Sequence, residues 1–402
     1  MKTENFHDAD SNRIDRRRFL QLGVAASALA IGCGSSGESQ AGADAGIEMR
    51  YRPLGNTGLR VSEITFGSAG FDNPALLLAA LDTGINTIST GDNIGYGRAD
   101  ELIGDVISRL GSRRDELVLC AGDVIRPGTT KQQILDSIDA QLRRLRTDHV
   151  EVFRTGGVTS PDDLVVDSLF EAFEEARRAG KVMHLALAGH SGGMQSCLNT
   201  AIDDGRFEAF FTKYDFVSYP DQDQILQRAA ERGIGTVVFK VNAGNRQREI
   251  TDLEAGGLSF RQATVKWALT HSYVASVCVG ITNFEQVREY AVAVGSQLSE
   301  SEAAMLHRYA QEMYDKYCRF CGTCERNCPR DVAIADVMRY AMYFKYYGRE
   351  KRSMELYGAL PQRSRASTCD RCPGPCDTGC PFGRRVRDEL VEAHQLLSFA
   401  EV

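Results

Sequence analysis

Eight of the twelve cysteines lie in two short blocks near the C-terminus, and each block ends on a proline. The spacing is CxxCxxCxxxCP in the first block and CxxCxxxCxxxCP in the second. Three thiolates two or three residues apart wrap one loop around three irons of a cube, while a fourth comes from elsewhere. The two blocks therefore predict a pair of [4Fe-4S] clusters. Their expected ligands are Cys318, Cys321, Cys324 and Cys328, and then Cys369, Cys372, Cys376 and Cys380.

In proteins with two such clusters, the fourth cysteine of a block binds the other cluster. On that pattern Cys380 joins the first three cysteines of block one, and Cys328 joins the first three of block two. Zinc and disulfides are the alternatives. Zinc favours paired CxxC knuckles around one tetrahedral site, and disulfides suit an exported chain but would close only very small loops here.

The composition limits the other possibilities. A chain of 402 residues with 43% hydrophobic content can bury one large core or two moderate ones. A net charge of −7 argues against a nucleic-acid partner, because no basic stripe is available to neutralise phosphates. Cys120, Cys197 and Cys278 stand in apolar or helical contexts, so we expect them to pack as small buried hydrophobes.

Residues 1–33 have the pattern of a targeting signal. Arg16-Arg17-Arg18-Phe19-Leu20 is a twin arginine followed by Phe-Leu, which is the signature of the Tat pathway. The apolar run Leu22 to Ile31 is too short for a stable membrane anchor. The sequence thus predicts export by the Tat translocase to the periplasm or another extracytoplasmic place. That pathway carries folded proteins, which suits a cofactor inserted beforehand.

Ala30-Ile31-Gly32-Cys33 also resembles a lipobox, in which Cys33 would be lipidated and become the new N-terminus. Cleavage after Ala30 by an ordinary signal peptidase is the competing interpretation. Residues 34–48 are small and polar and are expected to form a flexible linker. Lipid at Cys33 would make the chain a membrane-anchored lipoprotein that does not span the bilayer.

Residues 49–298 alternate short β-branched runs with longer amphipathic stretches. Eight strand and helix alternations in about 250 residues predict a (β/α)8 barrel. A doubly wound sheet is second choice, since no GxGxxG follows the first strand. The expected strands are Val61 to Phe66, Thr87 to Ser89, Leu117 to Cys120, Val150 to Phe153, Met183 to Ala188, Ala209 to Thr212, Thr236 to Phe239 and Ser276 to Gly280.

The opening Met49 to Ser62 resembles the N-terminal hairpin of the aldo/keto reductases. Gly180-Lys181-Val182-Met183-His184 and Gly280-Ile281-Thr282-Asn283-Phe284 match the same family. Tyr340-Ala341-Met342 and Ala393-His394, beside the cysteines, resemble its iron-sulfur branch. The resemblance implies an aldo/keto reductase barrel over residues 49–298 and a C-terminal α-helical ferredoxin-like iron-sulfur domain over residues 299–402.

The family's chemistry requires a Tyr that protonates a carbonyl, a Lys held by an Asp, and a His, while NADPH supplies hydride. This chain holds Ser89 at the Asp position, Gly122 at the Lys position and Gly156 at the His position. The Tyr position holds Ile94 without gaps, or Tyr96 when counted back from the following helix. Without the Lys, Tyr96 would keep a pKa of about 10 and donate poorly at neutral pH. The resemblance therefore implies a degenerate tetrad.

Two further groups of residues bear on the barrel site. Gly280, Thr282 and Gln286 keep the pattern with which the family holds the adenosine phosphate of NADPH, and Arg288 could add charge. The alternative is that this stretch is only a turn and a helix cap, so NADPH binding is doubtful. The other group consists of charged residues that follow or end predicted strands and could replace the lost tetrad: Asp92, Asp123, Arg154 and His190.

Three functions are compatible with these patterns. The first is an exported oxidoreductase that moves electrons between two [4Fe-4S] clusters and a small-molecule substrate at the barrel mouth, without the family's hydride mechanism. The second is an electron-transfer or docking partner of another redox enzyme, with a non-catalytic barrel. The third is an NADPH-dependent carbonyl reductase with an atypical site.

Overall fold

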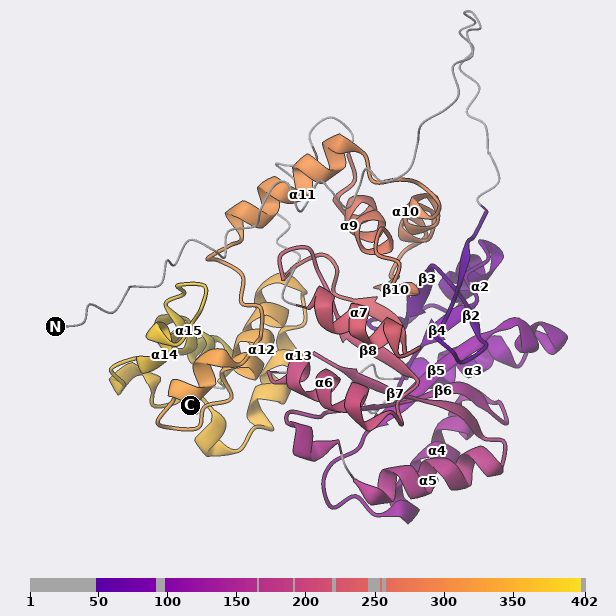
Figure 1. The fold of residues 1–402 in the computed structure, drawn as a ribbon, viewed down its shortest axis with the longest axis horizontal. Coiled ribbons are helices and arrows are strands. Elements are labelled where there is room, and N and C mark those ends of the chain that lie inside the picture. The colour runs from indigo at the N-terminus through magenta and orange to yellow at the C-terminus, as the bar shows by residue number, and fades with distance from the viewer. Residues whose placement is uncertain are drawn as a thin grey trace, which may run out of the picture.

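The computed structural model describes residues 48–91, 98–164, 166–190, 192–218, 222–244, 254 and 258–398. Eight parallel strands close into a barrel in the order β10-β3-β4-β5-β6-β7-β8-β9, so the predicted (β/α)8 barrel is confirmed (Figure 1). The strands are β3 (Ile64–Gly67), β4 (Thr87–Ser89), β5 (Val118–Val124), β6 (Val150–Gly156), β7 (Val182–Gly189), β8 (Ala209–Lys213), β9 (Gly235–Phe239) and β10 (Ser276–Gly280).

The barrel strands separate two apolar layers. Successive side chains of a strand point to opposite faces, so Cys120, Val152 and Phe211 fill the barrel interior. Their neighbours Leu119 and Phe153 belong instead to the layer under the helices. The helices around the barrel are α2 (Pro74–Asp82), α3 (Ala99–Ile107), α4 (Lys131–Leu145), α5 (Asp167–Arg178), α6 (Met194–Asp204), α7 (Asp223–Glu231), α9 (Phe260–Leu269) and α10 (Phe284–Ala293).

A two-stranded hairpin, β1 (Tyr51–Pro53) and β2 (Arg60–Ser62), closes the bottom of the barrel. Its Leu54 and Val61 are fully buried with the interior side chains. The expected single strand Val61 to Phe66 is therefore wrong in extent. The chain leaves the hairpin after Ser62, and the barrel strand begins only at Ile64.

The C-terminal part is helical and lies beside the barrel. Its first helix packs against α9, and its later helices lie on the side of α6 (Figure 1). Its helices are α11 (Glu300–Glu312), α12 (Ile334–Tyr346), α13 (Glu350–Gly358), α14 (Pro375–Thr378) and α15 (Val386–Leu397). Its short 3-10 turns are η4 (Thr323–Asn327), η5 (Gln362–Ser364) and η6 (Cys369–Arg371), whereas η2 (Gly111–Glu116) and η3 (Pro161–Asp163) belong to the barrel.

Polar contacts fasten this C-terminal part to the carboxyl ends of barrel strands. Lys240, just after β9, hydrogen-bonds the Tyr343 hydroxyl of α12. The Arg319 guanidinium donates to the Val217 carbonyl, which follows β8, at 3.2 Å. The carboxyl ends of the strands are where barrel enzymes place their active sites, so the extension lies at the functional end. No helix among the described residues has the length and apolarity to cross a membrane.

Candidate functional site

The three positions where the family's tetrad would stand end up close together on neighbouring strands. Ser89 ends β4, Gly122 lies near the end of β5, and Gly156 ends β6. A Cβ added at Gly122 would lie 2.0 Å from the Arg154 carbonyl oxygen of the paired strand. A lysine therefore does not fit at position 122 on this backbone. Tyr96 lies outside the described residues.

Arg154 occupies the space inside the upper barrel. It is 5% exposed, donates a hydrogen bond to the Thr90 carbonyl, and stands 5.1 Å from the Phe211 ring centre. Its Nε has no hydrogen-bond partner among the described residues, and none of the ion pairs found there includes this guanidinium. Burial raises the pKa of the nearby Cys278 thiol to about 11 although Arg154 opposes it. The Cys278 thiol is thus a neutral group in the barrel packing. It lies near the Arg154 guanidinium, which forms no ion pair with a carboxylate among the described residues.

Asp123 is bonded to the chain around it. Its carboxylate accepts from the Ser137 hydroxyl of α4 and from the Val124 backbone N–H. These bonds hold Asp123 toward the helix layer. The other acidic candidate, Asp92, lies outside the described residues.

The predicted NADPH residues form a self-contained helix start. The Thr282 N–H donates to the Gln286 side-chain oxygen at 2.8 Å, and the Asn283 side chain caps the Gln286 N–H at 2.9 Å. Gly280 ends β10, and Arg288 is exposed on α10. Because side chains already accept hydrogen bonds from these N–H groups, the arrangement acts as an N-terminal cap of α10. NADPH binding stays a prediction.

The cysteines gather in two groups that mix the two blocks. Burial, and then the charges of Cys318, Cys321 and Cys380, raise the pKa of Cys324. Burial, and then the charges of Cys328, Cys376 and Cys372, raise the pKa of Cys369 to about 11. Each group therefore contains three cysteines of one block and the last cysteine of the other.

The loops that carry these cysteines pack closely. The Asn327 side chain of η4 donates to the Pro375 carbonyl of α14 at 3.4 Å. A Cβ at Gly379 would approach the Asn327 side-chain amide to 2.8 Å, so that side chain would have to shift. The Thr323 hydroxyl donates to the Cys321 sulfur at 3.3 Å. Hydrogen bonds of that kind tune a metal-bound thiolate.

Neither alternative ligand chemistry is visible in the described residues. No three His, Cys, Asp or Glu side chains among them are arranged to hold one metal ion. Every cysteine in that part of the chain is free of a disulfide. These two observations test neither the predicted clusters nor the zinc alternative, and both stay predictions.

A cavity of about 40 Å³ lies where the barrel mouth meets the first cysteine block, and we call it the mouth cavity. Residues after β7, at the end of β8 and in the cysteine loop line it. They include His190, Gln195, Lys213, Ser218, Arg319 and Cys321. The mouth cavity therefore brings the predicted cluster ligand Cys321 next to residues at the barrel mouth.

The charged groups at this mouth are mainly cations. The Lys213 ammonium donates to the Ser218 hydroxyl and to the Asp215 carboxylate, both at 2.6 Å. The His190 pKa is lowered by burial and then by the charges of Lys240, Arg339 and Lys213. The imidazole is therefore neutral, and its buried Nδ1 has no hydrogen-bond partner among the described residues.

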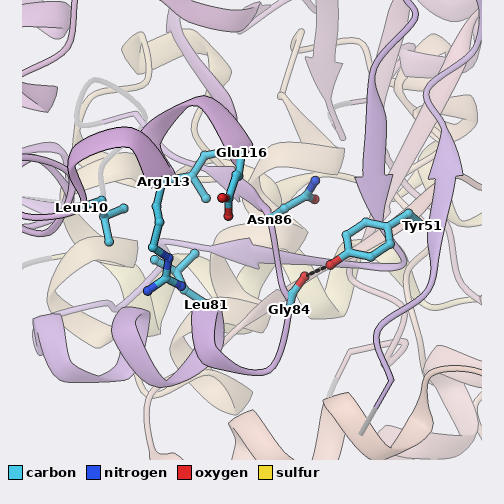
Figure 2. A pocket seen from close by; sticks show the side chains of 8 residues that line it. Tyr51, Leu81, Gly84, Asn86, Leu110, Arg113 and Glu116 are labelled. Carbon is cyan, nitrogen blue, oxygen red and sulfur yellow. Dashed lines mark hydrogen bonds between the residues drawn. The ribbon is translucent and has the colours of Figure 1, made fainter.

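A larger groove of about 270 Å³ lies at the opposite end of the barrel. Figure 2 shows Tyr51, Gly84, Asn86, Arg113 and Glu116 along it, with the Tyr51 hydroxyl bonded to the Gly84 carbonyl. Its residues precede β4 and β5, at the amino ends of the strands. Since barrel chemistry belongs to the other end, this groove is not the candidate site.

The family model described as "Aldo/keto reductase family" matches residues 71–310, more than half of the chain. The chain belongs to the aldo/keto reductase family. This family match ends before the first cysteine block at Cys318.

Individual relatives are distant but cover the barrel. The chain is similar to the uncharacterized oxidoreductase YrpG of Bacillus subtilis, 25% identical over 313 residues, with 64% of this chain and 95% of the relative covered. Versiconal hemiacetal acetate reductase of Aspergillus parasiticus is 19% identical over 345 residues, covering 66% and 97%. The holo structure of aldo-keto reductase AKR11C1 from Bacillus halodurans is 21% identical with a TM-score of 0.55, covering 65% and 96%. This last likeness shows the fold.

Sequence reasoning missed the mouth cavity. It singled out His190 and the cysteines, but neither Lys213 nor Lys240 was among the candidate residues. A signal was present, because both lysines directly follow or end a β-strand and so stand at the functional end of a barrel.

Proposed function

We propose that this aldo/keto reductase is an exported iron-sulfur oxidoreductase that moves electrons between two [4Fe-4S] clusters and a substrate at the barrel mouth. The observation that carries the proposal is the contact between the two parts, since Cys321 lines the mouth cavity together with barrel residues. When bound, each cluster would accept and release one electron, so the pair supplies two.

The donor chemistry fits such clusters. Cys318, Cys321, Cys324 and Cys380 would hold one cube, and Cys369, Cys372, Cys376 and Cys328 would hold the other. The grouping of thiols inferred from their mutual effects on pKa agrees with this crossed pattern. The first cube would then be the one beside the barrel.

The family's hydride mechanism is not part of the proposal. Gly122 leaves no room for the lysine, and the Thr282 N–H is already bonded. An external one-electron carrier would instead reduce the clusters, and a two-electron reduction of substrate would take up two protons from groups at the mouth. Lys240 and Tyr343, hydrogen-bonded to each other at this end, are suited to hold one of them.

The export part of the proposal rests on the sequence alone. The Tat signal, the lipobox at Cys33 and the linker lie outside the described residues. Transport after folding would let the clusters be inserted before export, and lipid at Cys33 would keep the enzyme at the membrane surface.

An anaerobic titration tests the proposal. Dithionite is expected to bleach the cluster absorbance of the purified protein and air-free ferricyanide to restore it, while NADPH neither binds saturably nor reduces the clusters. Saturable NADPH binding with carbonyl reduction that is lost in Ser89→Ala or Tyr96→Phe would contradict it and favour an ordinary reductase. If reduction destroys the clusters, their role is structural and not electron transfer.

The alternative, a non-catalytic barrel that serves another redox enzyme, is favoured by the small volume of the mouth cavity. It predicts reversible clusters with no ligand at the barrel mouth. The experiment on the mouth cavity below therefore separates it from the main proposal.

A further inference from the structure

Basic side chains gather at the barrel mouth. The charges of Arg339 and Lys213 act on both Lys240 and His190, and the charge of Arg349 also acts on Lys240. Asp215 pairs with Lys213, and Asp336 pairs with Arg339. Among the described residues, no carboxylate forms an ion pair with Lys240, whose polar partner is the neutral Tyr343 hydroxyl.

A buried lysine without a counter-charge loses its proton more readily, which reduces the positive charge at that position. Removing a cation from water costs several kcal/mol unless a counter-charge or hydrogen bonds replace the lost hydration. Burial lowers the pKa of Lys240 well below its usual range, and the charges of Arg339 and Lys213 lower it further.

The mouth cavity has the size and the polar groups for a small ligand. A cavity measured in this way needs about 10 to 15 Å³ for one water, so about 40 Å³ holds a few non-hydrogen atoms. The Lys213 ammonium and the Arg319 guanidinium line it from opposite parts of the chain. The His190 side chain adds a polar nitrogen, buried Nδ1, that no described residue satisfies.

We propose that the mouth cavity binds a small carboxylate or oxyanion between Lys213, Arg319 and His190, beside the cluster ligand Cys321. This inference deepens the proposed function by naming the chemical class of the substrate, and it rests on that function only for the role of the anion as electron acceptor or donor. Binding itself requires no electron transfer.

The conformation of the cysteine loop supports a built site. Phe320 is buried and adopts a left-handed backbone with φ of 58°, which is rare for a bulky residue. Such conformations persist where the surroundings impose them and are concentrated at functional sites. Its ring packs 5.8 Å from Tyr317 and 5.9 Å from the Lys213 ammonium. The loop is thus held so that Arg319 and Cys321 both reach the mouth cavity.

The test measures the binding of sodium formate and, separately, sodium acetate to the cluster-loaded protein at constant ionic strength. Calorimetry gives the affinity, and EPR of the dithionite-reduced protein reports whether the anion changes the signal of a nearby cluster. Saturable binding that shifts the EPR signal is expected. Benzoate, which is too large for about 40 Å³, is expected not to bind.

Variants locate the site. Lys213→Met is expected to weaken formate binding at least tenfold, whereas Lys181→Met is expected to leave it unchanged. Lys181 is a matched control, because it also pairs with an aspartate, Asp139 at 2.5 Å, but precedes β7 at the opposite end of the barrel. Gln195→Phe fills the mouth cavity without breaking an ion pair and is expected to abolish binding. It therefore tests the site even if Lys213→Met fails to fold.

The outcomes are distinct from those of the proposed function. Formate binding that is equally tight in Gln195→Phe and in the unchanged protein would overturn the anion site, and so would the absence of saturable binding by either anion. The proposed function instead fails if the protein carries no redox-active clusters, whatever the anions do.

Discussion

Gly122 of β5 lies directly against the backbone of the paired strand β6. The Arg154 carbonyl oxygen would stand 2.0 Å from any added Cβ, a contact that the backbone can relieve only by moving. Gly122→Ala is expected to lower the free energy of unfolding by about 2 kcal/mol or more. Gly280→Ala is the control, because its Cβ would meet the Ala69 carbonyl at an ordinary 3.4 Å.

Urea unfolding of both variants tests this expectation. Equal midpoints for Gly122→Ala and Gly280→Ala would show that position 122 tolerates a side chain. The loss of the family's lysine would then no longer have a structural cause.

His271 makes stability depend on pH. Burial lowers its pKa to about 4, so the folded protein keeps it neutral while the unfolded chain protonates it near pH 6.5. Between these values the unfolded state binds more protons, so stability falls as pH drops from 6.5 to 4, by about 3 kcal/mol from this group. The fluorescence of Trp267, the single tryptophan, reports unfolding from 4.8 Å away.

The expected result is a steeper loss of urea midpoint over this range in the unchanged protein than in His271→Gln. Parallel pH profiles would contradict the assignment. The comparison of slopes remains valid even if His271→Gln is less stable at every pH.

At the scale of elements, the close packing of η4 on α14 decides which cysteines share a site. If the fourth ligands cross, Cys318 and Cys380 belong to one cube, so a Cys318→Ser, Cys380→Ser double variant loses one cluster and keeps about four irons. Cys318→Ser with Cys328→Ser then damages both cubes and retains few irons. Iron quantitation of the two double variants checks this.

The matched pair makes the result easy to interpret. Both double variants carry Cys318→Ser, and each also loses the last cysteine of one block. If each block instead held its own cluster, the two outcomes would be exchanged.

The sequence predicted regular elements better than it predicted the site. The β-branched runs identified all eight barrel strands, because a strand buried on both sides needs continuous apolar residues. The first strand was too long, since Val61 and Ile64 are both apolar and only tertiary packing divides hairpin from barrel. The position of Lys213 at a strand end was a usable signal, but its meeting with Arg319 was not predictable, because the two are far apart in the sequence and meet only through the docking of the extension.

At the scale of the whole molecule, the extension turns a barrel mouth into an interface. α12 and the first cysteine loop cover strand ends that a carbonyl reductase would keep for its cofactor and substrate, and they bring Tyr343, Arg339 and Cys321 with them. The site that remains is built from both parts of the chain.

Two four-iron clusters are the central feature of the proposed function. Iron and acid-labile sulfide, measured per chain in protein purified without oxygen, test it directly. We expect about eight of each, together with EPR signals from the reduced protein. One or two zinc ions per chain with no sulfide, or about four irons alone, would contradict it.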